Sequence, residues 1–254
     1  MNLIHDSAII SKYSRIGKNV SIGAYVVIHD NVEIHDDVII EPFCFIGVEP
    51  NSRAKKCSSD SLTIHTKTII KSHSTLYQAS NIGENCFIGH SVIIRENSDI
   101  KKNVQIGNNS EIQGDLLINH DTKLQSNVFV GKFSKIGRFV WLLPGVYLLN
   151  DKIPPSYNLS GPSVDDFSVI GANSKILPNV NVAFSTIVGS NSLITSDTNK
   201  LSLYYGNPAK LISTIDEFNK KKDSIFYPWH LRFNKNYNLK ELRKIYEENL
   251  TKAD

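Results

Sequence analysis

The residues of this chain best suited to proton transfer near neutral pH are its eight histidines. His120 stands apart because a carboxylate follows it directly, in the segment INHDTKL (residues 118–124). A carboxylate beside an imidazole can hold the tautomer of the ring, so that the imidazole acts as a general base. His90, in the segment IGH (residues 88–90), is the second candidate. Asp121 is therefore expected to orient His120.

A six-residue repeat of aliphatic residues runs through the chain and must position these side chains. Its first run is Ile4, Ile10, Ile16, Ile22, Ile28, Ile34, Ile40 and Ile46. A second run extends from Ile64 to Leu148, and a third from Val164 to Ile194. A hexapeptide period is typical of a parallel β-helix, in which each coil buries its apolar side against its neighbours.

The pattern inside each hexad predicts a short strand followed by a turn. Val20 and Ile22 lie two residues apart, as do Val26 and Ile28, and side chains alternate along an extended chain. The next inward pair starts four residues after Ile22, at Val26, which is farther along the chain than a continuing strand would place it. Gly, Asn, Asp and Lys fill the intervening positions, as in Gly17-Lys18-Asn19, and suit a turn. The predicted fold is all-β, with about ten coils in a column on the order of 45 Å long.

The domain organisation follows from where the repeat stops. Residues 1–212 are predicted to form the β-helix and residues 213–254 a C-terminal extension. Loops are expected at 47–63 and at 149–163. The first spans the 18 residues from Ile46 to Ile64, which is the length of one coil and is consistent with one coil looped out. Residues 238–250 carry the spacing of an amphipathic helix, interpreted as a cap on the coil end or a packing element.

Composition narrows the function classes. The three cysteines lack metal-ligand spacing, so Cys44 and Cys86 are interpreted as core residues and no metal is expected. A net charge of +3 is too small to favour nucleic acid as a partner. The chain has neither a membrane-spanning apolar run nor the basic and apolar start of a signal peptide, which predicts a cytoplasmic protein without a membrane span.

Outward positions of the repeat divide into two apolar faces and one polar face. The first face carries Ile69, Phe87 and Trp141. The second carries Ile93, Phe129 and Tyr147. The third carries Thr63, Asn81, Asp99 and Lys135, with Leu117 as the exception. Exposed apolar stripes of this kind usually meet a partner, which favours an oligomer.

The units of the form [LIV]-G-x-N-x-x resemble those of the hexapeptide-repeat acyltransferases, over roughly residues 1–212. This resemblance implies a left-handed β-helix, although the general crossover rule favours right-handed coils. It also implies a homotrimer that binds donor and acceptor in clefts between neighbouring prisms. The segment around His120 and Asp121 is similar to the hexad that carries the catalytic base in the acyltransferase of lipid A synthesis and in some nucleotide-sugar N-acetyltransferases.

The resemblance extends to the binding residues. One coil is 18 residues, so Lys102 and Arg138 are expected next to His120 in the adjacent coils, where cations favour the neutral imidazole. The residues expected to contact the acceptor are His90, Asn119, Arg138, Asn150 and Asp151. The turn Gly206-Asn207-Pro208-Ala209-Lys210 follows a form common in acetyltransferases that use coenzyme A. In that resemblance Pro208 and Lys210 lie near the adenosine phosphates, and Gly171-Ala172 and Gly189-Ser190 line the pantetheine.

These features together predict an acetyl-CoA-dependent N-acetyltransferase acting on a nucleotide-linked amino sugar, for a bacterial surface polysaccharide such as lipopolysaccharide or capsule. A sugar O-acetyltransferase and a lipid A-type acyltransferase using acyl carrier protein remain alternatives. The first is disfavoured because related O-acetyltransferases carry a histidine where this chain has Asn150-Asp151. A zinc-dependent carbonic anhydrase is disfavoured because no two histidines lie 18 residues apart. The remaining hypothesis is a purely structural or binding protein without catalytic activity.

Overall fold

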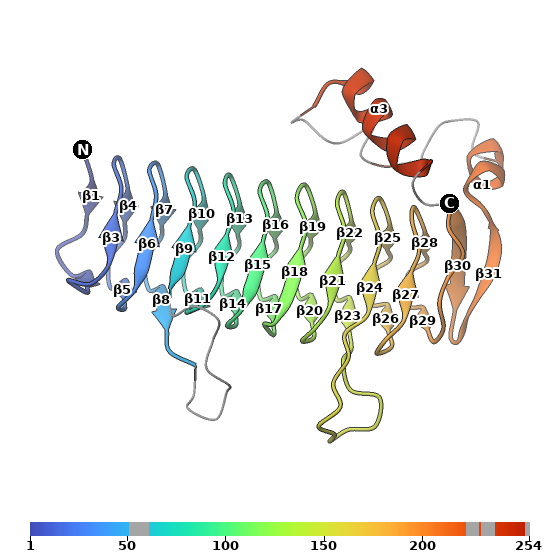
Figure 1. The fold of residues 1–254 in the computed structure, drawn as a ribbon, viewed down its shortest axis with the longest axis horizontal. Coiled ribbons are helices and arrows are strands. Elements are labelled where there is room, and N and C mark those ends of the chain that lie inside the picture. The colour runs from blue at the N-terminus through green and yellow to red at the C-terminus, as the bar shows by residue number, and fades with distance from the viewer. Residues whose placement is uncertain (51–60, 222–228, 230–236, 252–254) are drawn as a thin grey trace.

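The computed structural model describes residues 1–50, 61–221, 229 and 237–251. They form a long column of short parallel strands that runs across Figure 1 from the N-terminus to a closing hairpin. The predicted β-helix is therefore confirmed. Cys57 and His230, which the sequence places in a loop and in the extension, lie outside the described residues.

Three sheets form the three faces of the column, and each face receives one strand per coil. Face A contains β1 (Leu3–Ile4), β4 (Ser21–Ile22), β7 (Ile39–Ile40), β10 (Ile69–Ile70), β13 (Phe87–Ile88), β16 (Gln105–Ile106), β19 (Lys123–Leu124), β22 (Trp141–Leu142), β25 (Val169–Ile170) and β28 (Ile187–Val188). Face B contains β2 (Ile9–Ile10), β5 (Val27–Ile28), β8 (Phe45–Val48), β11 (Thr75–Tyr77), β14 (Ile93–Ile94), β17 (Glu111–Ile112), β20 (Phe129–Val130), β23 (Tyr147–Leu148), β26 (Lys175–Ile176) and β29 (Leu193–Ile194). Face C contains β3 (Arg15–Ile16), β6 (Val32–Ile34), β9 (Leu62–Ile64), β12 (Asn81–Ile82), β15 (Ser98–Ile100), β18 (Leu116–Ile118), β21 (Lys135–Ile136), β24 (Ser163–Val164) and β27 (Asn181–Val182).

Strands one coil apart pair in parallel without a register shift over most of the column. Ile69 pairs with Phe87 and Ile70 with Ile88, so an outward residue stacks on an outward residue and an inward one on an inward one. The inward aliphatic residues from Ile22 to Ile194 are buried in one continuous cluster. The ladder read from the sequence is thus the hydrophobic core, and its burial is the main favourable contribution to folding.

The corners between faces are built on left-handed backbone conformations. Most residues with positive φ outside glycine recur every six positions, and Asn and Asp, which tolerate this region, supply many of them. Asn19, Asn103 and Asp121 are examples, with φ values of 56°, 60° and 62°. We name each corner by the faces it joins: the A–B corner, the B–C corner and the C–A corner. His120 and Asp121 lie at the C–A corner, between β18 and β19.

Both insertions leave the column at the B–C corner. The first runs from β8 on face B to β9 on face C. Because the chain advances by one face, one hexad of the 18-residue step from Ile46 to Ile64 is ordinary and 12 residues are inserted. The interpretation of a full looped-out coil is therefore wrong, since it would have returned the chain to the same face. The second insertion joins β23 to β24, and Figure 1 shows the chain leaving the column on the same side after β8 and after β23.

The C-terminal part closes one end of the column and then returns along it. Strand β30 (Ser202–Gly206) continues face A, and β31 (Ala209–Thr214) pairs with it antiparallel. Helix α1 (Ile215–Lys221) follows. Helix α3 (Leu239–Leu250), capped by Asn238, confirms the helix predicted for 238–250. In Figure 1 it lies along the side of the column, so it is a packing element and not a cap on the coil end.

The two described cysteines occupy inward positions, as predicted. Cys44 and Cys86 are buried, and burial raises their thiol pKa values to about 11 and about 12. Both therefore remain protonated near neutral pH and behave as small core side chains. Within the described residues, no helix has the length and apolar character to cross a membrane.

Inward and outward positions should differ sharply in their contribution to stability. Leu76 is fully buried and its neighbour Thr75 points outward. We expect Leu76→Ala to lower the free energy of unfolding by about 2–5 kcal/mol, because it leaves a cavity, and Thr75→Ala by less than about 1 kcal/mol. Urea denaturation followed by circular dichroism measures both. Equal losses would contradict this assignment of the core.

Candidate functional site

The C–A corner carries a polar ladder that ends at Asp121. Asn85 donates to Asn103 at 2.8 Å, and Asn103 donates to Asp121 Oδ1 at 3.0 Å, each bond joining residues one coil apart. The next residue of the same column is Phe139, which stacks on Phe167 with ring centroids 5.0 Å apart. Asp121 thus lies where the corner changes from polar to aromatic.

His120 and Asp121 form a hydrogen-bonded pair at this junction. His120 Nδ1 lies 2.6 Å from Asp121 Oδ2. The Asp121 side chain is fully buried, whereas that of His120 is 29% exposed. Since an ionised carboxylate only accepts hydrogen bonds, Nδ1 carries the proton and the basic lone pair falls on Nε2. The ring is therefore presented in the tautomer that a general base requires.

Asp121 is held as a carboxylate by its surroundings. Burial raises its pKa, but hydrogen bonds from His120, Tyr237 and Asn103 outweigh that effect, and the net pKa is lowered. The Tyr237 hydroxyl lies 2.9 Å from Asp121 Oδ2. Burial and the neighbouring carboxylate raise the pKa of Tyr237 to about 12, so this hydroxyl stays protonated and donates. Sequence reasoning missed Tyr237, because no part of the repeat links it to the corner.

The chain before and within α3 docks on the aromatic part of the corner. The buried cluster comprises Phe139, Phe167, Phe184 and Leu242, with Tyr237, Ile245, Tyr246 and others packed against it. Trp229 is buried, and its indole N–H donates to the carbonyl of Phe139 at 3.1 Å. These contacts bring the C-terminal extension against the coil that carries the His120–Asp121 pair.

The two cations expected beside His120 differ in their surroundings. Lys102, one coil before it, is exposed. Arg138, one coil after it, makes two hydrogen bonds to Asp166 Oδ2, at 2.8 and 2.5 Å, and a further one to Asn249 of α3. Its guanidinium is thus committed to neighbours within the chain, although a role toward the acceptor stays a prediction.

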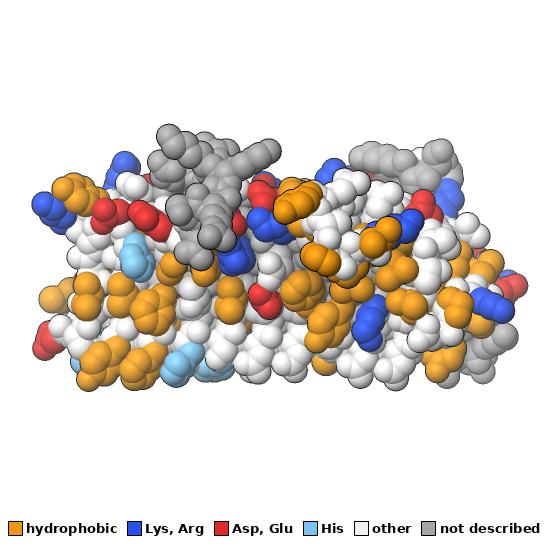
Figure 2. Space-filling model, turned by 90° about the horizontal axis from the view of Figure 1, so that it is seen from below, with side chains coloured by type: hydrophobic (Ala, Val, Ile, Leu, Met, Phe, Trp, Pro, Cys, Tyr) orange, Lys and Arg blue, Asp and Glu red, His pale blue; other side chains and the backbone are white. Residues whose placement is uncertain are grey.

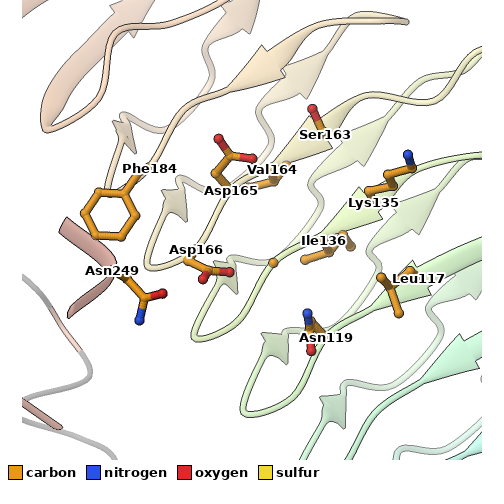
Figure 3. Close-up of a pocket in the computed structure, with 11 residues that line it drawn as sticks. Leu117, Asn119, Lys135, Ile136, Ser163, Val164, Asp165, Asp166, Phe184 and Asn249 are labelled. Atoms are coloured by element: carbon orange, nitrogen blue, oxygen red, sulfur yellow. The ribbon is translucent and has the colours of Figure 1, made fainter. Parts of the chain in front are cut away.

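A groove of about 360 Å³ lies on face C beside this corner. Its lining residues are Leu117, Asn119, Lys135, Ile136, Gly137, Ser163, Val164, Asp165, Asp166, Phe184 and Asn249. Figure 3 shows face C strands along it and Asn249 of α3 at one end. His120 is not among the lining residues, but Asn119, directly before it, is. Burial, together with the nearby Asp166, raises the pKa of Asp165 in this groove despite a hydrogen bond with Asn181.

The remaining predicted residues lie at other places on the column. His90, Gly171, Ala172, Gly189 and Ser190 all fall at the A–B corner. His90 Nδ1 lies 2.8 Å from Ser72 Oγ. A side chain at Gly189 would meet the Tyr205 ring at 2.3 Å, so close packing of β30 explains this glycine.

Asn150 and Asp151 lie in the second insertion, at the B–C corner. Asp151 accepts hydrogen bonds from the backbone and the hydroxyl of Ser156, at 2.8 and 2.7 Å, which lower its pKa and order the loop. Pro208 lies in the tight turn between β30 and β31, and Lys210 in β31. One chain therefore does not bring together the residues that the sequence predicts for acceptor and donor. Among the described residues, no three metal-ligating side chains converge on a metal site.

The outward apolar stripes are present on faces A and B. Large exposed side chains include Leu3, Ile39 and Phe87 on face A and Ile9, Phe45, Ile93 and Tyr147 on face B. Figure 2, which views the molecule from below, shows hydrophobic side chains in rows along the column. Trp141 differs from the expectation, because Trp229 of the same chain packs on it with ring centroids 4.9 Å apart.

Comparison with known proteins agrees with the repeat and the fold. The family described as "Bacterial transferase hexapeptide (six repeats)" matches residues 13–47 and 79–114. Serine acetyltransferase 4 of Arabidopsis thaliana is 38% identical over 56 residues, which are 22% of this chain and only 16% of that relative.

Solved structures share the architecture over nearly the whole chain. The Arabidopsis UDP-N-acetylglucosamine acyltransferase superposes with a TM-score of 0.59 at 15% identity, covering 93% of this chain and 85% of that one. The UDP-N-acetylglucosamine acyltransferase from Bacteroides fragilis gives 0.61 at 17% identity, covering 97% and 91%. These structures confirm the left-handed parallel β-helix, and together with the family match they confirm the resemblance to the hexapeptide-repeat acyltransferases.

The buried Asp121 carboxylate should make stability depend on pH. Its pKa is lowered by folding, so its contribution is present above the unfolded value of about 4 and is lost as pH falls through the lower folded value. We expect Asp121→Asn to cost about 1–3 kcal/mol at pH 7 and progressively less below pH 4.

Urea unfolding of both proteins between pH 7 and pH 3 measures this difference. Asp6→Asn, at an exposed turn, is the control and should change stability little at any pH. A cost of Asp121→Asn that stays constant down to pH 3 would contradict a carboxylate stabilised by its donors.

Proposed function

We propose that this hexapeptide-repeat protein is an acyltransferase that moves the acetyl group of acetyl-CoA to the amino group of a nucleotide-linked amino sugar. The observation that carries the proposal is the 2.6 Å hydrogen bond between His120 and Asp121, which leaves Nε2 as a partly exposed base beside a groove. The family resemblance supplies the reaction class. Such an acceptor would serve a bacterial surface polysaccharide and would be met in the cytoplasm.

In this mechanism the chain contributes a base and a binding surface. His120 Nε2 takes a proton from the acceptor amine while the amine nitrogen attacks the thioester carbonyl. The C–N bond forms, the C–S bond breaks, and the coenzyme A thiolate receives the proton from the imidazolium. Asp121 stabilises the imidazolium and keeps the ring in one tautomer. Backbone N–H groups would stabilise the oxyanion between these steps.

The chemistry of the groove suits a polar acceptor with charge. Lys135 offers an ammonium group to an anionic part such as a phosphate, and Ser163 and Asn119 offer hydrogen bonds to hydroxyl groups. Asp165, with its raised pKa, adds a carboxyl group that can donate or accept. These four side chains lie on face C or at its edge, within two coils of His120.

Assembly as a homotrimer would unite residues that one chain keeps apart. The A–B and C–A corners are the two edges of face A, on which Leu3, Ile39 and Phe87 are exposed. Farther along this face Val169 and Ile187 are buried, and Trp229 of the same chain packs on Trp141. If three copies turn face A toward a common axis, the C–A corner of one faces the A–B corner of the next. His120 would then lie opposite the edge that carries Gly171-Ala172 and Gly189-Ser190, the residues expected to line coenzyme A.

The proposed base is tested by paired histidine variants. We expect His120→Asn to lower kcat/KM at least about 100-fold, since general base catalysis contributes that much or more, and His5→Asn to change it less than twofold. The assay follows free thiol released from acetyl-CoA, with a panel of nucleotide-linked amino sugars. Activity of His120→Asn within a few-fold of the unchanged protein would remove it as the base. Loss with His90→Asn alone would move the base to the A–B corner.

The same assay separates the alternatives for donor and acceptor. Turnover with a hydroxyl sugar in place of the amino sugar would indicate an O-acetyltransferase. Turnover with long-chain acyl carrier protein and none with acetyl-CoA would indicate the lipid A type of reaction.

The trimer is tested by placing a charge on face A. Phe87 is 39% exposed in one chain, and a buried interface would make Asp there costly. We expect the unchanged protein to have the mass of three chains by light scattering, and Phe87→Asp to have that of one. Thr63→Asp, on face C, is the control and should remain trimeric. A monomeric unchanged protein would contradict the proposed assembly.

A further inference from the structure

We infer that Tyr237 is a positioning residue for the base, by which the C-terminal extension holds Asp121 and, through it, His120. This inference rests on the proposed function of His120. It assigns to the extension a part in the reaction beyond packing, although the extension lies more than 100 residues away in the sequence.

Tyr237 completes the set of donors around one carboxylate. Asp121 Oδ2 accepts from His120 Nδ1 at 2.6 Å and from the Tyr237 hydroxyl at 2.9 Å, while Oδ1 accepts from Asn103 at 3.0 Å. Three donors on two oxygens leave the carboxylate little freedom to rotate. Two of them come from neighbouring coils or the same turn, and the third comes from the extension. Rotation of Asp121 would carry the imidazole with it.

Packing alone does not require a hydroxyl at this position. The Tyr237 ring meets Phe139 edge-on, with centroids 5.8 Å apart, a contact that a phenylalanine ring would also make. Burying a hydroxyl without a partner is costly, and here its partner is the buried Asp121 carboxylate. The hydroxyl therefore contributes a hydrogen bond to the dyad rather than contact area.

The charged groups around His120 and Asp121 determine whether loss of the Tyr237 hydroxyl favours the protonated or the neutral imidazole. Among the described residues, Lys102 lies one coil before His120, Arg138 with its partner Asp166 one coil after, and Glu241 of α3 acts on Tyr237. Removing the Tyr237 donor changes none of these charges. It leaves the Asp121 carboxylate with one donor fewer, so more of its negative charge acts on the imidazolium. The protonated ring is then favoured, and the base form appears only at higher pH.

The matched variants are Tyr237→Phe and Tyr246→Phe. Both remove one hydroxyl from the same aromatic cluster. The Tyr246 hydroxyl, however, lies 3.0 Å from Ser185 Oγ and does not contact His120 or Asp121. We expect both to fold, with similar small decreases in melting temperature. Only Tyr237→Phe should lower kcat, by roughly fivefold to tenfold with KM within twofold, and move the acid limb of the kcat/KM profile up by about half a pH unit.

A second measurement does not depend on turnover. In protein labelled with 15N-histidine, the ring signal of His120 is assigned by its absence in His120→Asn and followed against pH. We expect its titration midpoint to move to higher pH in Tyr237→Phe and to stay in place in Tyr246→Phe. Unchanged titration and an unchanged pH profile in Tyr237→Phe would overturn the inference, as would equal changes in the two variants. If His120→Asn retains activity while the His120 titration still responds to Tyr237→Phe, the proposed function fails and the coupling stands.

Discussion

The architecture of this molecule depends on the vertical register of the coil, in which each residue outside the insertions lies over the equivalent residue of the preceding coil, 18 positions earlier. Parallel pairing without slips fixes this register, because a shift of one residue would turn the buried aliphatic row outward. Side chains at the corners consequently form columns as regular as the core. In such a column the same kind of side-chain contact can recur from coil to coil. A change of residue type therefore distinguishes one coil from the others.

The C–A corner changes type at the height of His120. Below it, amide side chains pass hydrogen bonds from Asn85 to Asn103 to Asp121. Above it, Phe139 and Phe167 stack and give the C-terminal extension an apolar surface. The buried carboxylate therefore receives a donor from the polar column and another from the docked extension, Tyr237. The pair at residues 120 and 121 lies at a level that both donors reach.

The sequence predicts the features that the six-residue repeat determines. It predicts few of the contacts made across the insertions or between the repeat and the C-terminal extension. The core, the inward cysteines and the His120–Asp121 pair follow from hexads alone. The face on which the chain continues after the first insertion does not follow from the hexads. One ordinary hexad plus 12 inserted residues gives the same 18-residue spacing as one full coil. Arg138 thus lies one coil from Asp166, 28 residues away, and this pairing is hidden from a count of 18. The contacts of Trp229 and Tyr237 with the coil lie outside any repeat and depend on tertiary packing.

The aromatic column also carries a conformational cost. Phe139 and Phe167 occupy left-handed backbone conformations, with φ of 55° and 64°, where Asn is the usual residue elsewhere in the chain. That conformation costs a phenylalanine about 1–2 kcal/mol, whereas burying the ring contributes about 1.5–3 kcal/mol. The two terms nearly balance for a covered ring, although Phe43 and Phe133 also have positive φ and remain exposed. Phe139 and Phe167 are at most 1% exposed, under the cover that the C-terminal extension helps to provide. The extension therefore packs directly on the aromatic residues of this corner, and the His120–Asp121 pair lies at the end of the aromatic column.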